Sequence, residues 1–228
     1  MVGASILPAC FYDGKLYFLF GKENSLADTP GWSDFGGGVD KGESIFQAAM
    51  REGSEELTGV LGDGKMISTL IRKNGGIFKM QKDTYHIHLF HLPYLEYKNM
   101  PKFYNNSHYF LWNRMNKKML NDTKLFEKIE IQWFTIEDMK KKRDEFRNFY
   151  KEIVDMIIEK ETEIRGFLEK KMTGHKKQRG TRKKKQQQGV YGYFLIAEYT
   201  HLYNSKETLP INELKRVTTL GGCADLHH

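Results

Sequence analysis

The stretch GGGVDKGESIFQAAMREGSEELTG, residues 36–59, decides which fold the chain can adopt. Its glycines favour a tight loop, and the residues after them predict a helix over about residues 44–58. That helix carries three carboxylates at relative positions i, i+3 and i+4: Glu52, Glu55 and Glu56. At roughly 3.6 residues per turn they fall within an arc of about 100°. The loop and helix therefore predict one element with an acidic patch.

Three like charges on one patch repel, and each i,i+4 pair of like charges destabilises a helix by a few tenths of a kcal/mol. A hard divalent cation removes that repulsion, and carboxylate oxygens suit Mg²⁺ or Mn²⁺. The chemistry indicated is metal-assisted attack on a phosphate or diphosphate. The alternative is a solvated acidic face with no ligand.

The same helix has a separate apolar stripe, which should pack against the rest of the domain. The stripe consists of Phe46, Ala49, Met50, Gly53 and Leu57. Glycine weakens a helix relative to alanine by about 0.5–1 kcal/mol. We therefore expect Gly53 to allow a close approach to a sheet.

The spacing of the glycine, arginine and glutamates closely resembles the Nudix box, and the lysine-rich composition with a basic tail resembles Nudix proteins of large DNA viruses. The matching residues are Gly37, then Glu43 after five residues, Arg51-Glu52 after seven more, and Glu55-Glu56 after a further two. Three positions depart from the box. Gly53 takes an apolar position, Thr58 replaces the terminal glycine, and Gly59 replaces the apolar residue after it. Because the glycine is displaced by one residue, we expect the helix to run slightly longer.

The resemblance implies an α/β fold, a Nudix-type α/β/α sandwich with a mixed sheet, over residues 1–172. It implies Mg²⁺ or Mn²⁺ as cofactor, bound by the three box carboxylates with a further ligand from the Gly36 or Gly37 carbonyl. It assigns Glu43 and Arg51 to a salt bridge that orients the catalytic element.

The general base varies in position across this family. In the messenger RNA decapping members it resembles a Glu just before a late strand that carries a Trp. Glu127 has that spacing to Trp133 and Glu130 is the second candidate, while Glu55 is the fallback within the box. Glu127 and Glu130 could each equally be an ordinary surface carboxylate with no catalytic role.

The 228 residues suit one domain with an appendage or two small domains. The two cysteines, Cys10 and Cys223, are far apart, which argues against a disulfide framework and favours a reducing compartment. No apolar run reaches about 18 residues, and the N-terminus lacks the pattern of a secretory signal. We expect an intracellular, cytoplasmic protein with no membrane partner, or a nuclear one.

The rest of the first domain predicts a hairpin around Asp13-Gly14, strands over residues 66–72 and 84–92, and a strand entering a helix over residues 127–139. Residues 98–126 look like an insertion rich in aromatic residues. It could form a substrate lid that stacks on a base, or a helix that packs on the core.

The C-terminal part predicts a long helix over residues 136–171, broken near Lys141, then a basic flexible segment over residues 173–189 and an extension over residues 190–228. The net charge of +7 is concentrated unevenly. The basic segment could contact a polyanion, act as a nuclear-targeting signal, or be a solvated tether. Its candidate polyanion contacts are Lys176, Lys177, Arg179, Arg182, Lys183, Lys184 and Lys185.

The sequence is compatible with three functions. The first is hydrolysis of the diphosphate linkage of a small nucleoside diphosphate derivative, such as a nucleotide sugar, a dinucleoside polyphosphate or a modified nucleoside triphosphate. The second is decapping of capped RNA, favoured by the basic segment and by the spacing of Glu127 to Trp133. The third is a non-catalytic nucleotide- or RNA-binding module, against which the intact carboxylate set argues.

Overall fold

A mixed β-sheet organises the computed structural model, which describes residues 2–24, 27, 29–116, 118–119 and 126–178. The strand order is β3-β2-β1-β6-β5, with β4 paired to β1 and β7 paired to β2. The strands are β1 (Gly3–Tyr12), β2 (Lys15–Glu23), β3 (Trp32–Ser33), β4 (Phe35–Gly38), β5 (Ile77–Lys82), β6 (Tyr85–His91) and β7 (Lys128–Thr135). The β1–β6 pair is parallel, and the other strand pairs described are antiparallel.

The hairpin between β1 and β2 is the one predicted from Asp13-Gly14. Both turn residues have positive φ angles, 49° and 76°, as the tight hairpin turns that match strand twist require. Only the second half of β1 pairs with β2, whereas its first half pairs with β4, from Gly3↔Gly38 to Ile6↔Phe35. The pairing with β4 therefore places the glycine loop beside the start of β1.

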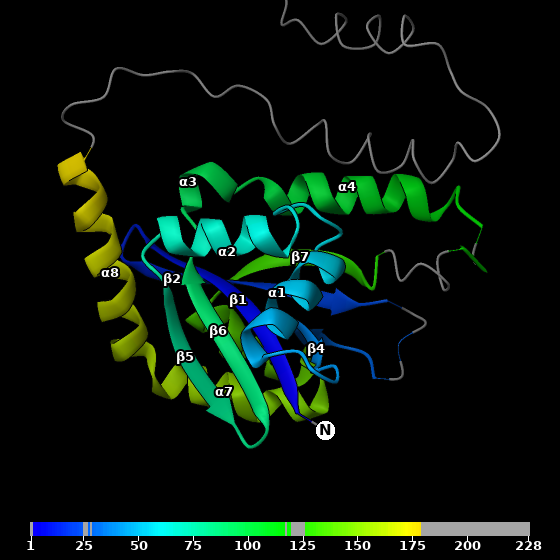
Figure 1. Ribbon diagram of the computed structural model, residues 1–228, viewed down its shortest axis with the longest axis horizontal. Coiled ribbons are helices and arrows are strands. Elements are labelled where there is room, and N and C mark those ends of the chain that lie inside the picture. The colour runs from blue at the N-terminus through cyan, green and yellow to red at the C-terminus, as the bar shows by residue number, and fades with distance from the viewer. Residues whose placement is uncertain (1, 25–26, 28, 117, 120–125, 179–228) are drawn as a thin grey trace, which may run out of the picture. The chain divides into compact units, whose positions relative to one another are not determined.

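Helices cover both faces of the sheet, which confirms the α/β/α sandwich (Figure 1). On one face, α1 (Ile45–Glu56) packs on β1 and on α2 (Gly64–Lys73). On the other face, α6 (Ile136–Lys141), α7 (Lys151–Glu159) and α8 (Glu161–Gln178) contribute to the main apolar core. Successive side chains of β1 point to opposite faces of the sheet. Leu7 belongs to the main apolar core, whereas Ile6 contacts α1 on the other face.

Helix α1 begins at a capping box. The Ser44 hydroxyl accepts from the Gln47 amide, and the Gln47 side chain accepts from the Ser44 amide. A Cβ on Gly53 would lie 2.3 Å from Ile6 Cδ1, so the predicted close approach to the sheet is present.

The expectation of a longer helix is wrong. α1 ends at Glu56, and Thr58 itself takes the left-handed conformation, with a φ of 52°, before Gly59 at 71°. The Gly59 amide donates to the Ser54 carbonyl and closes the helix end.

The predicted strand over residues 66–72 is also wrong, because these residues form α2. Asp63 caps that helix by accepting from the Met66 amide at 2.8 Å. Ile67 and Ile71 are its buried residues, and their i,i+4 spacing is helical. Strand β5 is a further element that the sequence patterns do not indicate.

α3 (Tyr94–Tyr97) precedes the predicted insertion, and the insertion contains α4 (Met100–Trp112), so the helical alternative is the one observed there. α4 buries Met100, Tyr104 and His108 at i,i+4,i+8 spacing and packs on β7. The strand and helix predicted over residues 127–139 are present as β7 and α6.

The predicted long C-terminal helix is interrupted more often than expected. Short 3₁₀ turns, η1 (Arg143–Glu145) and η2 (Asn148–Tyr150), separate α6 from α7, and α8 follows. α8 reaches Gln178, so residues 173–178, the start of the predicted basic segment, are helical. The remainder of that segment and the extension over residues 190–228 lie outside the described residues. No helix within the described residues is long and apolar enough to cross a membrane.

Candidate active site

The glycine loop and α1 meet at very short range. β4 contributes Gly36 and Gly37, which pair with Ser5 and Ala4 of β1. A Cβ on Gly37 would lie 2.6 Å from the Cδ and Oε1 atoms of Glu52, and one on Gly36 would lie 2.3 Å from the Cβ of Ser5. Space therefore requires glycine at position 36, where the neighbours are backbone and Cβ atoms, whereas a methyl group at position 37 would displace the flexible end of Glu52.

Arg51 connects the loop to the helix. Its Nε donates to Glu43 Oε1 at 3.1 Å and its NH2 donates to Glu43 Oε2 at 2.9 Å. NH2 also donates to the Gly38 carbonyl at 3.0 Å. The hydrogen bonds from Arg51 lower the pKa of Glu43, and those from Glu43 raise the pKa of Arg51. This geometry suits the orienting role that the family resemblance assigns to the pair.

The three box carboxylates lie in three different environments. Glu52 is 13% exposed and accepts from Arg51 NH1 at 2.7 Å. Glu55 is 44% exposed and lies 3.4 Å from the same nitrogen. Glu56 is 5% exposed and lies 3.1 Å from the Nζ of Lys128. Each carboxylate thus already has a cationic partner supplied by the protein.

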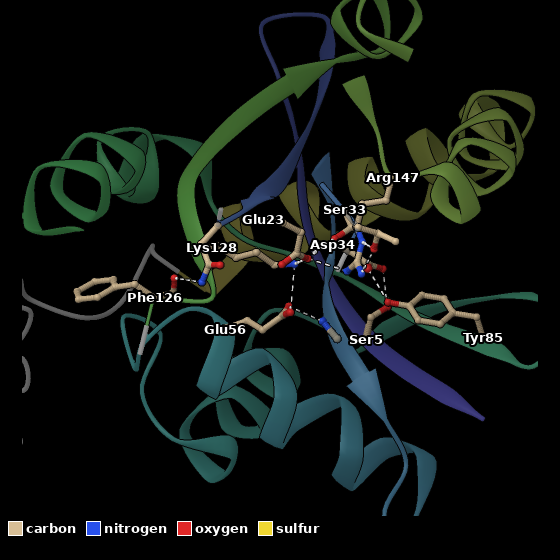
Figure 2. Close-up of polar contacts among 12 residues, drawn as sticks. Ser5, Glu23, Ser33, Asp34, Glu56, Tyr85, Phe126, Lys128 and Arg147 are labelled. Carbon is tan, nitrogen blue, oxygen red and sulfur yellow. Dashed lines mark hydrogen bonds and ion pairs between the residues drawn. The ribbon is translucent and has the colours of Figure 1, made fainter. Parts of the chain in front are cut away.

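Glu56 belongs to a buried charge cluster, defined here as Glu23, Glu56, Lys128 and Arg147 (Figure 2). Lys128 is fully buried and contacts both carboxylates, and its Nζ donates to Ser33 Oγ at 3.1 Å. Arg147 NH1 donates to Glu23 Oε1 at 2.7 Å. The cluster contains two carboxylates and two basic side chains, so its formal net charge is zero.

Burial is the largest single influence on the pKa values of Glu56 and Lys128. It raises the pKa of Glu56, while the Lys128 charge opposes that shift and the charges of Glu23 and Glu127 add to it. Burial acts to lower the pKa of Lys128, but the Glu56 and Glu23 carboxylates outweigh it and the pKa is raised. Lys128 is therefore a persistent cation, and further positive charge would stabilise the ionised form of Glu56.

A second buried carboxylate lies at the start of the glycine loop. Asp34 accepts hydrogen bonds from the hydroxyls of Ser5 and Tyr85, the latter at 2.7 Å. Burial raises the pKa of Asp34 to about 6, although these hydrogen bonds oppose the shift. The hydrogen bonds tie the residue before β4 to both β1 and β6, which holds the loop in place.

The donor chemistry of the site fits a hard divalent cation, because Glu52 and Glu55 supply carboxylate oxygens and Glu52 lies against the backbone of Gly37 in the glycine loop. Among the described residues, no group of three or more His, Cys, Asp or Glu side chains is already arranged to hold an ion. Arg51 and Lys128 occupy the carboxylates instead. Arg51 holds one oxygen each of Glu52 and Glu55, whereas at Glu56 Oε1 a metal would compete with Lys128.

The two strand candidates for the general base lie at the start of β7. Glu127 immediately precedes that strand, and its carbonyl accepts from the Asn24 amide at 2.8 Å. Its negative charge contributes to raising the pKa of Glu56. Glu130 pairs with Lys22 of β2 in the sheet register. Glu127 is thus the candidate with an electrostatic connection to the box.

The seven candidate polyanion contacts divide between two parts of the chain. Lys176 and Lys177 belong to α8, and the other five, from Arg179 to Lys185, lie outside the described residues.

Sequence reasoning missed Lys128, Glu23 and Arg147. Lys128 and Glu23 lie at the ends of apolar strands, which is an ordinary place for surface charge, and Arg147 lies in an interrupted helical segment. No spacing pattern relates the three, because they are far apart in the chain.

The NUDIX domain family matches residues 4–156, so the chain belongs to the Nudix family. It is a Nudix-type hydrolase by this membership and by its fold. Among curated proteins none matches significantly.

Solved structures similar to the chain include a C. elegans Ap4A hydrolase binary complex, with 16% identity, a TM-score of 0.40, and coverage of 72% of this chain and 97% of that one. A mutT/nudix family protein from Listeria innocua has 16% identity, a TM-score of 0.39, and coverage of 71% and 94%.

Proposed function

We propose that the chain is a divalent-metal-dependent pyrophosphohydrolase that cleaves the diphosphate linkage of a nucleoside diphosphate derivative. The observation that carries the proposal is the contact between the Glu52 carboxylate and the glycine loop, where a Cβ on Gly37 would lie 2.6 Å away. This contact places the Glu52 carboxylate directly against the glycine loop, whose backbone carbonyls are further oxygen donors. Both are oxygen ligands of the kind that Mg²⁺ and Mn²⁺ prefer.

In this proposal Glu52, Glu55 and Glu56, with the Gly36 or Gly37 carbonyl, hold the metal. A bound Mg²⁺ or Mn²⁺ would supply an acidified water and neutralise charge on the substrate phosphates. Arg51 keeps its bidentate bond to Glu43 and so fixes the loop relative to the carboxylates. Glu127 accepts the proton of the attacking water, with Glu130 and Glu55 as the other candidates.

The test is hydrolysis by the full chain, with Mg²⁺ or Mn²⁺, of a nucleotide sugar, a dinucleoside polyphosphate, a modified nucleoside triphosphate and capped RNA. Glu55→Gln removes one charge from a 44% exposed side chain, so turnover should fall by about 100-fold or more while the fold survives. Glu163→Gln, on α8, changes an exposed side chain that pairs with Lys160, and as the matched control it should keep full activity. Full turnover in Glu55→Gln would overturn the mechanism.

Messenger RNA decapping is the second candidate function. It is favoured by the position of Glu127 directly before β7 and by the effect of its charge on Glu56. Cleavage of capped RNA in preference to the small nucleotides would select this function. Binding of any of these ligands without cleavage, under every metal condition, would instead indicate a non-catalytic module.

A further inference from the structure

Lys128 has a complete set of partners inside the protein. Its ammonium group contacts Glu23 Oε1, Glu56 Oε1 at 3.1 Å and Ser33 Oγ at 3.1 Å. An ammonium group has three N–H donors, so each of them has an acceptor. Because its side chain has no exposed surface, it cannot reach a substrate phosphate. Its role must therefore act through the residues it contacts.

Glu56, in turn, has no free oxygen. Lys128 holds Oε1, and the Gly36 amide donates to Oε2 at 2.7 Å. A divalent cation bound to Oε1 would lie close to the ammonium group in a buried, weakly screened environment. Like charges at such distances repel strongly when water is excluded. The ammonium and a metal ion are therefore alternatives at this oxygen.

We propose that Lys128 is an internal counter-ion that competes with the divalent cation for Glu56 and withdraws toward Glu23 when the cation binds. This rests on the proposed function only in taking Glu56 as a metal ligand. Lys128 is a positioning residue, since it holds Glu56 in place and sets how tightly the metal binds.

The surroundings of Lys128 allow such a withdrawal. Glu23 already contacts the ammonium and is anchored by Arg147, so it is a ready second partner. The stem of Lys128 packs where a side chain at position 21 would otherwise lie, because a Cβ on Gly21 would be 2.7 Å from Lys128 Cγ. The stem is thereby confined, and the ammonium can move between the two carboxylates without leaving the cluster.

The test measures Mn²⁺ affinity of the full chain by the electron paramagnetic resonance signal of free Mn²⁺. The main variant is Lys128→Met combined with Glu23→Gln. It removes one positive and one negative charge, so the net charge around Glu56 is unchanged, and Met fills the space of the lysine stem. We expect Mn²⁺ to bind at least about tenfold more tightly, because the direct competitor is gone.

Glu23→Gln alone is the second variant and guards against failure of the first to fold. It takes away the carboxylate to which the ammonium withdraws, so Lys128 should stay on Glu56 and Mn²⁺ should bind about tenfold more weakly. Circular dichroism and a thermal melt establish that each variant is folded.

The outcomes separate this inference from the proposed function. Unchanged affinity in Glu23→Gln, or unchanged or weaker affinity in a folded double variant, overturns the inference and leaves a metal-dependent hydrolase standing. No Mn²⁺ binding by the wild type or either variant overturns both. The expected affinity changes without hydrolysis of any nucleotide or capped RNA would support the inference and overturn the proposed function.

Discussion

Arg51 and Glu43 form a two-pronged ion pair, with Nε–Oε1 and NH2–Oε2 distances of 3.1 Å and 2.9 Å, that joins α1 to the glycine loop before it. The same guanidinium also bonds the Gly38 carbonyl and Glu52. One side chain therefore sets the position of both the loop and a box carboxylate.

Arg51→Lys keeps the charge but loses the planar fork, so it cannot hold Glu43, Gly38 and Glu52 together. We expect the free energy of unfolding to fall by about 1–3 kcal/mol and turnover to fall with it. Urea unfolding and nucleotide hydrolysis measure the two effects. Arg143→Lys disrupts another bidentate pair, with Asp155, and serves as the control because it lies on the opposite layer. Equal loss of turnover in both variants would contradict the special role of Arg51.

Gly37→Ala places a methyl group 2.6 Å from the Glu52 carboxylate. The carboxylate is the end of a flexible side chain, so the fold should survive while Glu52 is displaced and turnover falls by about tenfold or more. Gly166→Ala on α8 is the control, since a Cβ there meets nothing within 4 Å. It should leave activity intact and stabilise its helix by about 0.5–1 kcal/mol. Normal activity in Gly37→Ala would show that the Glu52 position is not critical.

Glu127→Gln tests the assignment of the general base. If Glu127 accepts the proton, the variant should lose turnover and the rise of rate with pH should flatten, while Mn²⁺ affinity is retained. Glu130→Gln is the paired control on the same strand. Should only Glu130→Gln behave in this way, the assignment moves to that residue of β7.

We expect the folded protein to lose stability in acid because His88 and His108 are buried. Burial lowers the pKa of His88 and of His108 below the ordinary value of 6.5. Both stay neutral in the folded protein, whereas the unfolded chain takes up protons as the pH falls through about 6.5. The free energy of unfolding should therefore decrease below that pH. Urea unfolding between about pH 7 and 5 should show a flatter dependence in His88→Gln.

The control for that experiment lies on the same strand as His88. His86→Gln makes the same substitution at a partly exposed position and controls for the replacement of histidine by glutamine itself. An unchanged slope in both His88→Gln and His108→Gln would show that other groups cause the acid dependence.

The basic residues after α8 predict an electrostatic contribution if RNA is the substrate. Neutralising Lys183, Lys184 and Lys185 should weaken RNA binding across sequences. It should also make the plot of log affinity against log salt shallower, by about one unit for each phosphate that is no longer neutralised. Hydrolysis of a small nucleotide should barely change. Equal RNA affinity and slope in the triple variant would favour a tether and the small-nucleotide function.

Much of the catalytic element follows from short-range patterns. The helix over about residues 44–58, the hairpin at Asp13-Gly14 and the spacing from Glu43 to Arg51 each relate residues that are at most a few turns apart. The local sequence was misleading over residues 66–72, where the apolar residues fit both a strand and a helix. The helix that forms depends on the Asp63 cap and on burial of Ile67 and Ile71. The Asp63 cap and the i,i+4 spacing are local signals that favour the helix, and the packing of α2 on α1 adds a tertiary one.

By itself, the sequence determined the family, the glycine loop and the helix that carries three carboxylates, because all of these are encoded within one continuous stretch. Only the tertiary structure decided the charge state around Glu56. Lys128 lies 105 residues from Glu23 in the chain, and Arg147 lies 124 residues from it. Their proximity arises from the pairing of β2 with β7 and from the turn that leads into α7. Burial then makes their charges interact strongly, which no local pattern could indicate.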